Sequence, residues 1–266
     1  MKIGFIGTGN MGGALARAAA KGGHTLLLAN RTPAKAEALA KELGGTVCPN
    51  AVAAEAAELL FLGVKPQGLP GLAGELAPVL QARKGNAPVV VSMATAVTLR
   101  ELDAMLGGGL PLIRIMPNTP AAVGAGTILY AAQNVTDAQL SAFRAVLAQA
   151  GLLLPLPEAQ IDAASAISGC GPAFCFQFAD ALALGGVRAG LSYPDACRLA
   201  AQTMLGAAEM LLQGGEAPDV LKMRVCSPAG TTIEGVLALE QGGFSYTVQN
   251  AVTAAYRRTV EMTRKG

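Results

Sequence analysis

The segment Ile3-Gly4-Phe5-Ile6-Gly7-Thr8-Gly9-Asn10-Met11-Gly12 decides the fold class of this 266-residue chain. It begins as a short apolar run typical of a buried strand, continues through a Gly-x-Gly-x-x-Gly turn, and opens a small-residue helical stretch. In a chain with 33 glycines this spacing alone is weak evidence, because it also arises by chance. A strand before it, a helix after it and a second strand ending about 20 residues on are typical of a dinucleotide-binding turn. The alternative is a βα turn with a purely structural role.

The three glycines of the turn have different expected roles. Gly7 permits the tight turn, Gly9 lets the backbone approach a pyrophosphate, and Gly12 lets helix and strand pack closely. The helix N-terminus adds unpaired N–H groups and the positive end of its dipole. We therefore expect the whole turn to bind the cofactor: Gly7, Thr8, Gly9, Asn10, Met11 and Gly12.

The end of the second strand distinguishes between the two nicotinamide cofactors. Proteins that bind NAD place Asp or Glu there to bond the ribose 2′-hydroxyl, whereas this chain has Asn30-Arg31-Thr32, with Lys35 shortly after. No acidic side chain competes, and Arg31 can pair with a 2′-phosphate through two parallel hydrogen bonds. We expect these three residues to bind NADP(H) in preference to NAD(H). The alternative is that Arg31 is a solvated residue at the start of a helix.

Strand-like and helix-like segments alternate over residues 1–157, which predicts a Rossmann-type α/β domain with a doubly wound parallel sheet. Expected strands are 2–6, 25–29, 59–64, 88–93, 111–116, 126–131 and 152–156, and expected helices lie near 11–22, 33–43, 68–81, 98–106 and 136–149. The run Leu154-Pro155-Leu156-Pro157 ends this pattern, because proline cannot continue a strand ladder.

Residues 158–266 contain no convincing strand, so we expect a second, all-helical domain. Ser192 with Asp195 forms a capping box that opens a helix to about Gln213, and further helices are expected near 231–240 and 244–265. Wide apolar faces on these helices favour burial against another subunit, with a well-filled single core as the alternative. The predicted division is an NADP(H)-binding domain, 1–157, and a substrate and dimerisation domain, 158–266.

Composition excludes several classes of protein. Hydrophobic residues make up 52% of the chain and charged residues 14%, which excludes intrinsic disorder. The net charge of +2 without a basic run argues against a nucleic-acid partner. No stretch supplies about 20 consecutive apolar residues, and the N-terminus is not a signal peptide, so we expect no membrane segment. Five cysteines without a CxxC pair predict free thiols in the cytoplasm and no metal site.

The scarcity of proton donors says something about the substrate. Reduction of a carbonyl needs an acid for the developing alkoxide, but the single histidine, His24, precedes the second strand, at the edge of the sheet away from ligands. No tyrosine has a lysine four residues on, and the helical half has no lysine in a helix-centre setting. A protonated C=N bond already has its proton and needs no strong acid from the protein. An imine reductase therefore fits this small set of possible proton donors better than an alcohol dehydrogenase does.

Several segments in order resemble pyrroline-5-carboxylate reductases over essentially the whole chain. They are residues 3–12, 30–32, Asn50, Phe61-Leu62-Gly63-Val64-Lys65-Pro66-Gln67, Arg114-Ile115-Met116-Pro117-Asn118-Thr119-Pro120-Ala121, Ser168-Gly169-Cys170-Gly171-Pro172-Ala173, Ser227-Pro228-Ala229-Gly230-Thr231-Thr232-Ile233 and Leu239-Glu240-Gln241-Gly242-Gly243-Phe244.

The resemblance implies a role for most of these segments. Residues 227–232 precede a helix whose free N–H groups would bind the substrate carboxylate, which makes Ser227, Gly230, Thr231 and Thr232 the expected substrate-binding residues. Thr232 is the expected catalytic residue, its hydroxyl reaching the imine nitrogen. Alternatively, Thr231 and Thr232 merely cap the helix. The resemblance adds further cofactor-binding residues: Asn50, Val64, Lys65, Pro66 and Pro172. Lys65 has an equally good alternative as a solvated loop residue.

The chain departs from the family's usual residues at four positions. It has Cys170 where Ser is usual, Cys226 where Thr is usual, Ala229 where Gly is usual, and Phe174 where Tyr is common. The cysteines keep the size of Ser or Thr but weaken hydrogen bonding, and the Ala229 methyl group alters the substrate loop. These changes leave room for a preference for another cyclic imino acid.

The resemblance implies NADPH-dependent reduction of 1-pyrroline-5-carboxylate to L-proline, the last step of proline biosynthesis, by a homodimer or larger homo-oligomer joined through the helical domain. The enzyme rivals are a β-hydroxyacid dehydrogenase and another imine reductase of the same two-domain plan. The non-enzyme rival is a module that senses NADP without turnover.

Overall fold

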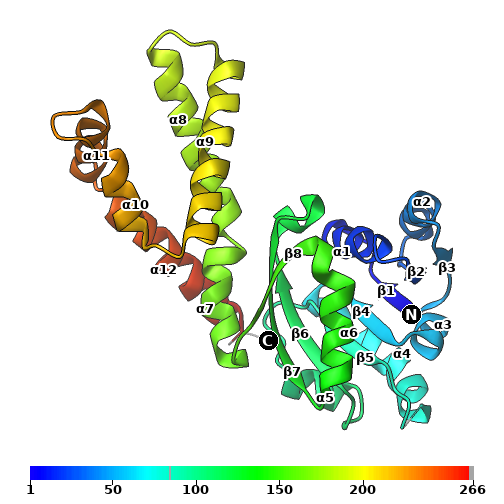
Figure 1. The fold of residues 1–266 in the computed structure, drawn as a ribbon. Coiled ribbons are helices and arrows are strands. Elements are labelled where there is room, and N and C mark those ends of the chain that lie inside the picture. Colours follow the sequence, from blue (N-terminus) through cyan, green and yellow to red (C-terminus); the bar gives the residue numbers. More distant parts are fainter. Residues whose placement is uncertain (84, 264–266) are drawn as a thin grey trace. The chain divides into compact units, whose positions relative to one another are not determined.

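The computed structural model describes residues 1–83 and 85–263 (Figure 1). Its backbone divides into two compact units. Residues 1–169 and the chain from Tyr256 onward form the first unit, and Cys170–Ala255 form the second. The domain boundary expected between residues 157 and 158 lies one helix before this division and stays a prediction.

The first unit is built on one sheet. Within the described residues its strands are β1 (Lys2–Ile6), β2 (Thr25–Ala29), β3 (Thr46–Val47), β4 (Leu59–Leu62), β5 (Val89–Ser92), β6 (Leu112–Pro117), β7 (Gly126–Gln133) and β8 (Gly151–Pro155). They lie in the order β3-β2-β1-β4-β5-β6-β7-β8. The order reverses on either side of β1 and β4, which places the topological switch point beside the glycine-rich turn that follows β1. The expected α/β fold class is confirmed.

The sheet departs from an all-parallel one at the β6–β7 pair. Strands β1 to β6 run parallel to one another, β7 runs antiparallel to β6, and β8 runs parallel to β7. The connection 118–125 contains only the 3₁₀ turn η2 (Thr119–Val123). A parallel pair needs a crossover of a dozen or more residues, so this short connection requires the reversal. As a result, the end of β6 and the start of β7 lie at the same edge of the sheet.

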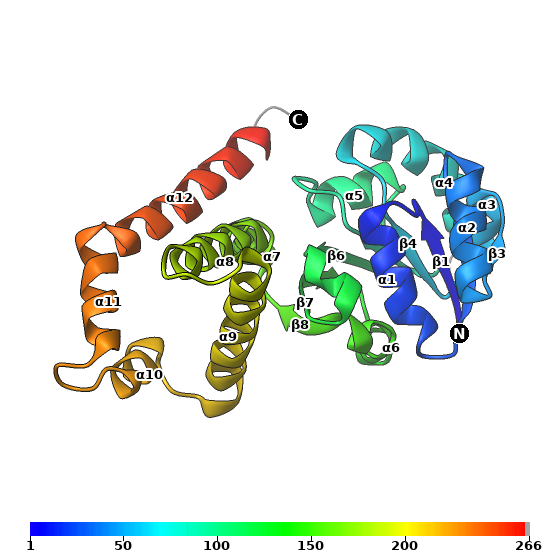
Figure 2. The same ribbon diagram turned by 90° about the horizontal axis from the view of Figure 1, so that it is seen from above.

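Helices cover both faces of the sheet, as Figure 2 shows. One face packs against α1 (Asn10–Ala20), α2 (Pro33–Leu43) and α6 (Asp137–Leu147), and the other against α3 (Asn50–Ala56), α4 (Leu69–Ala82), α5 (Leu99–Met105) and α7 (Glu158–Ser168). Because side chains alternate along a strand, Phe61 of β4 lies in the first layer and Leu60 and Leu62 lie in the second. The Phe61 ring stacks on Phe5 of β1 with ring centroids 4.6 Å apart.

Two short elements of the first unit were not expected from the sequence. Strand β3 has only two residues, too few to show an alternating pattern. Helix α3 begins after Pro49 and has seven residues, less than the length at which helical periodicity becomes distinct.

The described part of the second unit is entirely helical, as expected. Its helices are α8 (Gly171–Arg188), α9 (Tyr193–Gly214), α10 (Pro218–Val225), α11 (Thr231–Gln241) and most of α12 (Phe244–Thr263). Helices α8 and α9 pack against each other, and the Ser192 hydroxyl caps α9 by accepting a hydrogen bond from the Asp195 amide at 3.3 Å. Helix α10 was not expected; it has eight residues and little amphipathic pattern.

The second unit exposes much apolar surface. In the described chain only Ala183, Ala196 and Ala200 of α8 and α9 are buried, whereas Phe176 is 70% and Leu212 80% exposed.

The helical stretch Glu158–Arg188 is long and apolar enough to cross a membrane, with a mean hydropathy of 1.3. One such stretch is weak evidence of a membrane span, and it is interrupted at Gly169–Cys170 between α7 and α8.

Candidate functional site

The glycine-rich turn after β1 has the geometry that its sequence predicts. Gly7 has a φ of 99°, a left-handed conformation that disfavours any side chain. A Cβ on Gly7 would lie 2.5 Å from the Gly63 carbonyl oxygen, and one on Gly12 would overlap the Gly7 carbonyl oxygen. By contrast, a Cβ on Gly9 would meet no atom within 4 Å. The backbone is therefore closely packed at Gly7 and Gly12 and open at Gly9, where a pyrophosphate would approach.

The N-terminus of α1 has the properties of an anion site. Gly9 is the N-cap and no side chain caps the helix, and its first turn has no acidic residue. The first helical hydrogen bond, from the Gly13 amide to the Gly9 carbonyl, leaves the amides of Asn10, Met11 and Gly12 before it. Thr8 is 8% exposed, and its hydroxyl is buried with no partner among the described residues. These donors and the open space at Gly9 fit the phosphates of a dinucleotide.

The segment Asn30–Thr32 lies directly beside this turn. The Asn30 side chain accepts a hydrogen bond from the Thr8 amide at 3.1 Å and donates one to the Thr32 carbonyl at 3.0 Å. Asn30 therefore joins the two cofactor loops through its own amide group. Arg31 is exposed and pairs with no acidic side chain in the described part of the chain, so its guanidinium group is free for a phosphate.

The other expected cofactor residues of the first unit follow β3 and β4. Val64 and the exposed Lys65 follow Gly63, whose amide donates to the Ile6 carbonyl at 2.7 Å, and Pro66 opens the 3₁₀ turn η1 (Pro66–Gly68). Asn50 begins α3 and donates to the Glu75 carboxylate at 3.0 Å. The structure thus gathers the turn after β1, the segment after β2 and the segment after β4 at the carboxyl edge of the sheet, the edge at which such folds bind ligands.

Burial gives the Cys48 thiol near this edge a raised pKa. A thiol with a raised pKa stays protonated at neutral pH and is a poor nucleophile and metal ligand. In the described chain no group of three or more His, Cys, Asp or Glu residues is arranged to hold a metal ion.

The expected substrate loop belongs to the second unit. The Gly230 amide donates to the Ser227 carbonyl at 3.0 Å, and Ala229 between them has a φ of 57°, a conformation usual for glycine. Helix α11 begins at Thr231 with Gly230 as N-cap and no side-chain cap. Thr231 and Thr232 therefore occupy the first helical turn without capping it. Pro172 lies in the first turn of α8.

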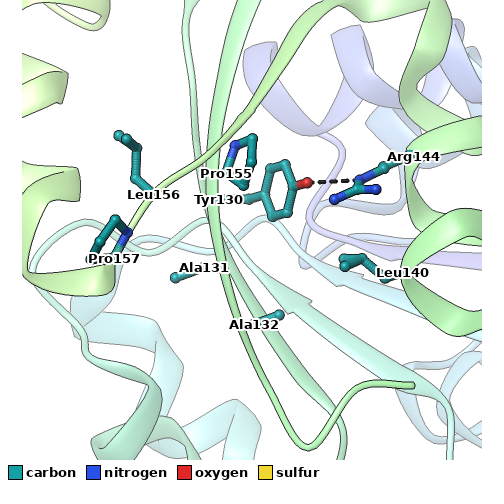
Figure 3. A pocket seen from close by; sticks show the side chains of 8 residues that line it. All are labelled: Tyr130, Ala131, Ala132, Leu140, Arg144, Pro155, Leu156 and Pro157. Atoms are coloured by element: carbon teal, nitrogen blue, oxygen red, sulfur yellow. Dashed lines mark hydrogen bonds between the residues drawn. The ribbon is translucent and has the colours of Figure 1, made fainter. Parts of the chain in front are cut away.

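The cavity in Figure 3 lies elsewhere. It has a volume of about 350 Å³ and is lined by Tyr130, Ala131, Ala132, Leu140, Arg144, Pro155, Leu156 and Pro157. The Arg144 side chain donates to the Tyr130 hydroxyl at 2.7 Å, as the figure shows. Tyr130 of β7 pairs with Ile115 of β6 and with Pro155 of β8, so the cavity lies at the β7–β8 side of the sheet, with β4, β5 and β6 between it and β1. No residue expected to bind cofactor or substrate lines this cavity.

The segment 114–121 contains two buried polar residues for which the sequence predicts no role. Arg114 is 3% exposed and pairs with two acidic side chains of α7, and Asn118 is 8% exposed and bonds two backbone groups. Both could have been recognised in the sequence, because each is a polar residue within or just after an apolar strand.

Comparisons with known proteins match each half of the chain to a family. Residues 158–262 match the family described as pyrroline-5-carboxylate reductase dimerisation, and residues 2–96 match the family described as NADP oxidoreductase, coenzyme F420-dependent. The pyrroline-5-carboxylate reductase of Synechocystis sp. is 39% identical, and the match covers 100% of this chain and 99% of the relative.

Solved structures agree with these matches. The structure of a pyrroline-5-carboxylate reductase from Coxiella burnetii is 32% identical with a TM-score of 0.90, covering 97% of both chains. That of Plasmodium falciparum pyrroline carboxylate reductase with NADP bound is 30% identical with a TM-score of 0.85, covering 99% of both chains. With its glycine-rich turn intact and relatives matched from end to end, this chain belongs to the pyrroline-5-carboxylate reductase family.

Proposed function

We propose that this protein reduces 1-pyrroline-5-carboxylate to L-proline with NADPH as the hydride donor, the final step of proline biosynthesis. The observation that supports this most is the match of the whole chain to reductases of this family, 39% identical for the relative from Synechocystis sp.. The glycine-rich turn also supports it, because the backbone is closely packed at Gly7 and Gly12 and open at Gly9.

NADPH supplies a hydride when bound, and the protein's own residues bind and orient the reactants. The amides at Asn10–Gly12 and the Thr8 hydroxyl bind the pyrophosphate, and Arg31 with Thr32 binds the 2′-phosphate. Asn50 and Val64–Pro66 are proposed to contact the ribose and nicotinamide side, and Pro172 the nicotinamide. None of these contacts requires a strong acid, because the imine nitrogen of the substrate is already protonated.

The substrate is proposed to bind at the N-terminus of α11. The free amides of Thr231 and Thr232 bind its carboxylate, assisted by Ser227 and by Gly230, whose own amide closes the loop onto the Ser227 carbonyl. The Thr232 hydroxyl accepts a hydrogen bond from the protonated ring nitrogen, which would hold the imine carbon in place to receive a hydride from NADPH. Absence of a side-chain cap on α11 supports this assignment, because it leaves both the amides and the two threonine hydroxyls available.

We also propose a domain division and an assembly for the chain. Residues 1–157 form the NADP(H)-binding domain and residues 158–266 the helical substrate domain. The family matched by residues 158–262 is described by its dimerisation, so the exposed apolar surface of the helices is proposed to join two copies into a homodimer or larger homo-oligomer. The protein is proposed to be cytoplasmic, with no membrane or nucleic-acid partner.

The decisive experiment follows NADPH oxidation by the purified protein with 1-pyrroline-5-carboxylate and, separately, with its six-membered analogue. We expect turnover with the five-membered substrate to exceed that with the analogue, and the Thr232→Ala variant to lose turnover while binding NADPH normally. Thr231→Ala is the matched control within the same helical turn. NADPH binding without turnover of either imine would identify a sensing module, and faster turnover of the six-membered imine would identify a different imine reductase.

A further inference from the structure

Asn118 links three parts of the first unit at the ligand edge of the sheet. It directly follows β6, which ends at Pro117, and its side chain is 8% exposed. Its carbonyl oxygen accepts a hydrogen bond from the Thr127 amide, at the start of β7, at 2.7 Å. Its amino group donates to the carbonyl of Ser168, the last residue of α7, at 2.9 Å. The side-chain amide thus accepts one hydrogen bond and donates another, and we call this pair of hydrogen bonds the Asn118 bridge. An aliphatic side chain could form neither.

The other end of α7 is fixed by a second polar group. Arg114 of β6 is 3% exposed and bonds Asp162 at 2.6 Å, and its other amino group lies 3.4 Å from Glu158. The Glu158 carboxylate also accepts a hydrogen bond from the Leu99 amide at 2.7 Å. Helix α7 is therefore held near both ends, by Arg114 and by Asn118, against the same strand.

The bridge from Asn118 fixes the point at which the chain leaves α7. Ser168 is succeeded by Gly169 and Cys170, and α8 begins at Gly171 with Pro172 in its first turn. The Ser168 hydroxyl is itself buried without a partner in the part of the chain that the structure describes. A buried hydroxyl without a partner calls for a specific reason, and a ligand at this edge would supply one.

We propose that Asn118 is a positioning residue for hydride transfer: by fixing the Ser168 carbonyl at the ligand edge of the sheet, it holds the C-terminal end of α7 in place beside the nicotinamide. This inference rests on the proposed function. It predicts that loss of the bridge impairs the chemical step and leaves cofactor affinity intact, because the side-chain hydrogen bonds of Asn118 go to Thr127 and Ser168, and neither belongs to the phosphate-binding turn.

The test is the Asn118→Asp variant. One carboxylate oxygen still accepts from the Thr127 amide, whereas the other replaces the donor and faces the Ser168 carbonyl oxygen, which it repels. We expect kcat to fall about 10- to 100-fold, in line with small misplacements of a reacting group, while the KM for NADPH changes less than about twofold. We also expect a larger isotope effect on kcat with NADPH deuterated at the transferred position.

Matched variants separate this role from a purely structural one. Asn86→Asp makes the same chemical change at an exposed position of the first unit and should leave every value unchanged. If Asn118→Asp does not fold, Asn118→Ser removes the bridge without adding a charge and should show the same change in kcat. A lower melting temperature with unchanged kcat and isotope effect would overturn the inference. Wild-type protein without imine reduction would instead refute the proposed function.

Discussion

Arg31 is the residue on which the choice between NADPH and NADH depends. It is exposed and has no acidic partner among the described residues. The side chain of the preceding residue, Asn30, bonds the backbone amide of Thr8 and the backbone carbonyl of Thr32. Its guanidinium group is therefore available to a 2′-phosphate without first breaking an ion pair.

The Arg31→Ala variant should raise the KM for NADPH about 10- to 100-fold, the equivalent of about 1.5–3 kcal/mol for a hydrogen bond to a charged group. The KM for NADH should change little, because NADH has no 2′-phosphate. Steady-state kinetics with both cofactors check this, with Arg100→Ala, also exposed, as the control. Equal changes for the two cofactors would show that Arg31 does not bind the 2′-phosphate.

Single residues of the phosphate-binding turn were predictable because its glycines follow from backbone geometry alone. Asn30 is predicted to belong to the cofactor site, but the hydrogen bonds of its side-chain amide with the backbone of Thr8 and Thr32 could not be predicted. Thr8 lies 22 positions away in sequence, and local pattern does not show which distant amide a side chain meets. The roles of Arg114 and Asn118 were missed for the same reason, since their partners on α7 lie 44 to 50 positions away.

At the scale of the elements, the length of a helix or strand decided whether it could be predicted from the sequence. Long helices such as α9 and the apolar strands were predictable, because burial on one or both faces leaves a periodic pattern. The direction of β7 could also have been predicted, because the connecting residues 118–125 are too few for a parallel crossover. The two-residue β3 and the short α3 and α10 depend on contacts that no periodicity shows.

The hairpin of α8 and α9 has a titratable contact of its own. The Tyr193 hydroxyl donates to the Asp180 carboxylate at 2.7 Å, and this hydrogen bond raises the pKa of Tyr193 to about 12. An unfolded tyrosine has a pKa of about 10. The raised value adds stability that is fully present below about pH 10 and is lost as the pH rises toward 12.

Absorbance titration of tyrosinate should therefore show one group ionising late, and Tyr193→Phe should remove that late step. The same variant should weaken the fall in melting temperature between about pH 10 and 12. Tyr246→Phe, at a side chain that is 71% exposed, is the control and should leave the late step in place. A late step that persists in Tyr193→Phe would assign it to another tyrosine.

At the scale of the whole molecule, the two units differ in how they bury apolar surface. The first has core layers on both faces of its sheet, whereas helices of the second expose large side chains such as Leu199, Leu205 and Leu212. The sequence already indicated this surplus, and the family matched by residues 158–262 is described by its dimerisation, which supports the proposed homo-oligomer. Which residues meet in the assembly depends on the partner's surface, so the sequence of one chain does not specify it.

Light scattering coupled to size-exclusion chromatography should show a dimer or a larger assembly for the wild-type protein. Leu205→Glu should shift the protein toward monomer, because it places a charge on exposed apolar surface of α9. Gln149→Glu adds the same charge at an exposed position of the first unit and should keep the assembly intact. A wild-type protein that elutes as a monomer at micromolar concentration would contradict the proposed homo-oligomer.

The close contact between the backbones of Gly7 and Gly63 limits which amino-acid substitutions this protein can accept. A Cβ on either glycine would lie 2.5 Å from the other's carbonyl oxygen. Where two side chains clash, a smaller neighbour restores the fit, but a carbonyl oxygen cannot be made smaller by mutation. Neither position can therefore be rescued by a change at the other. Variation in cofactor use, whether by drift or by design, has to occur at neighbouring sites such as 30–32 while this pair stays unchanged.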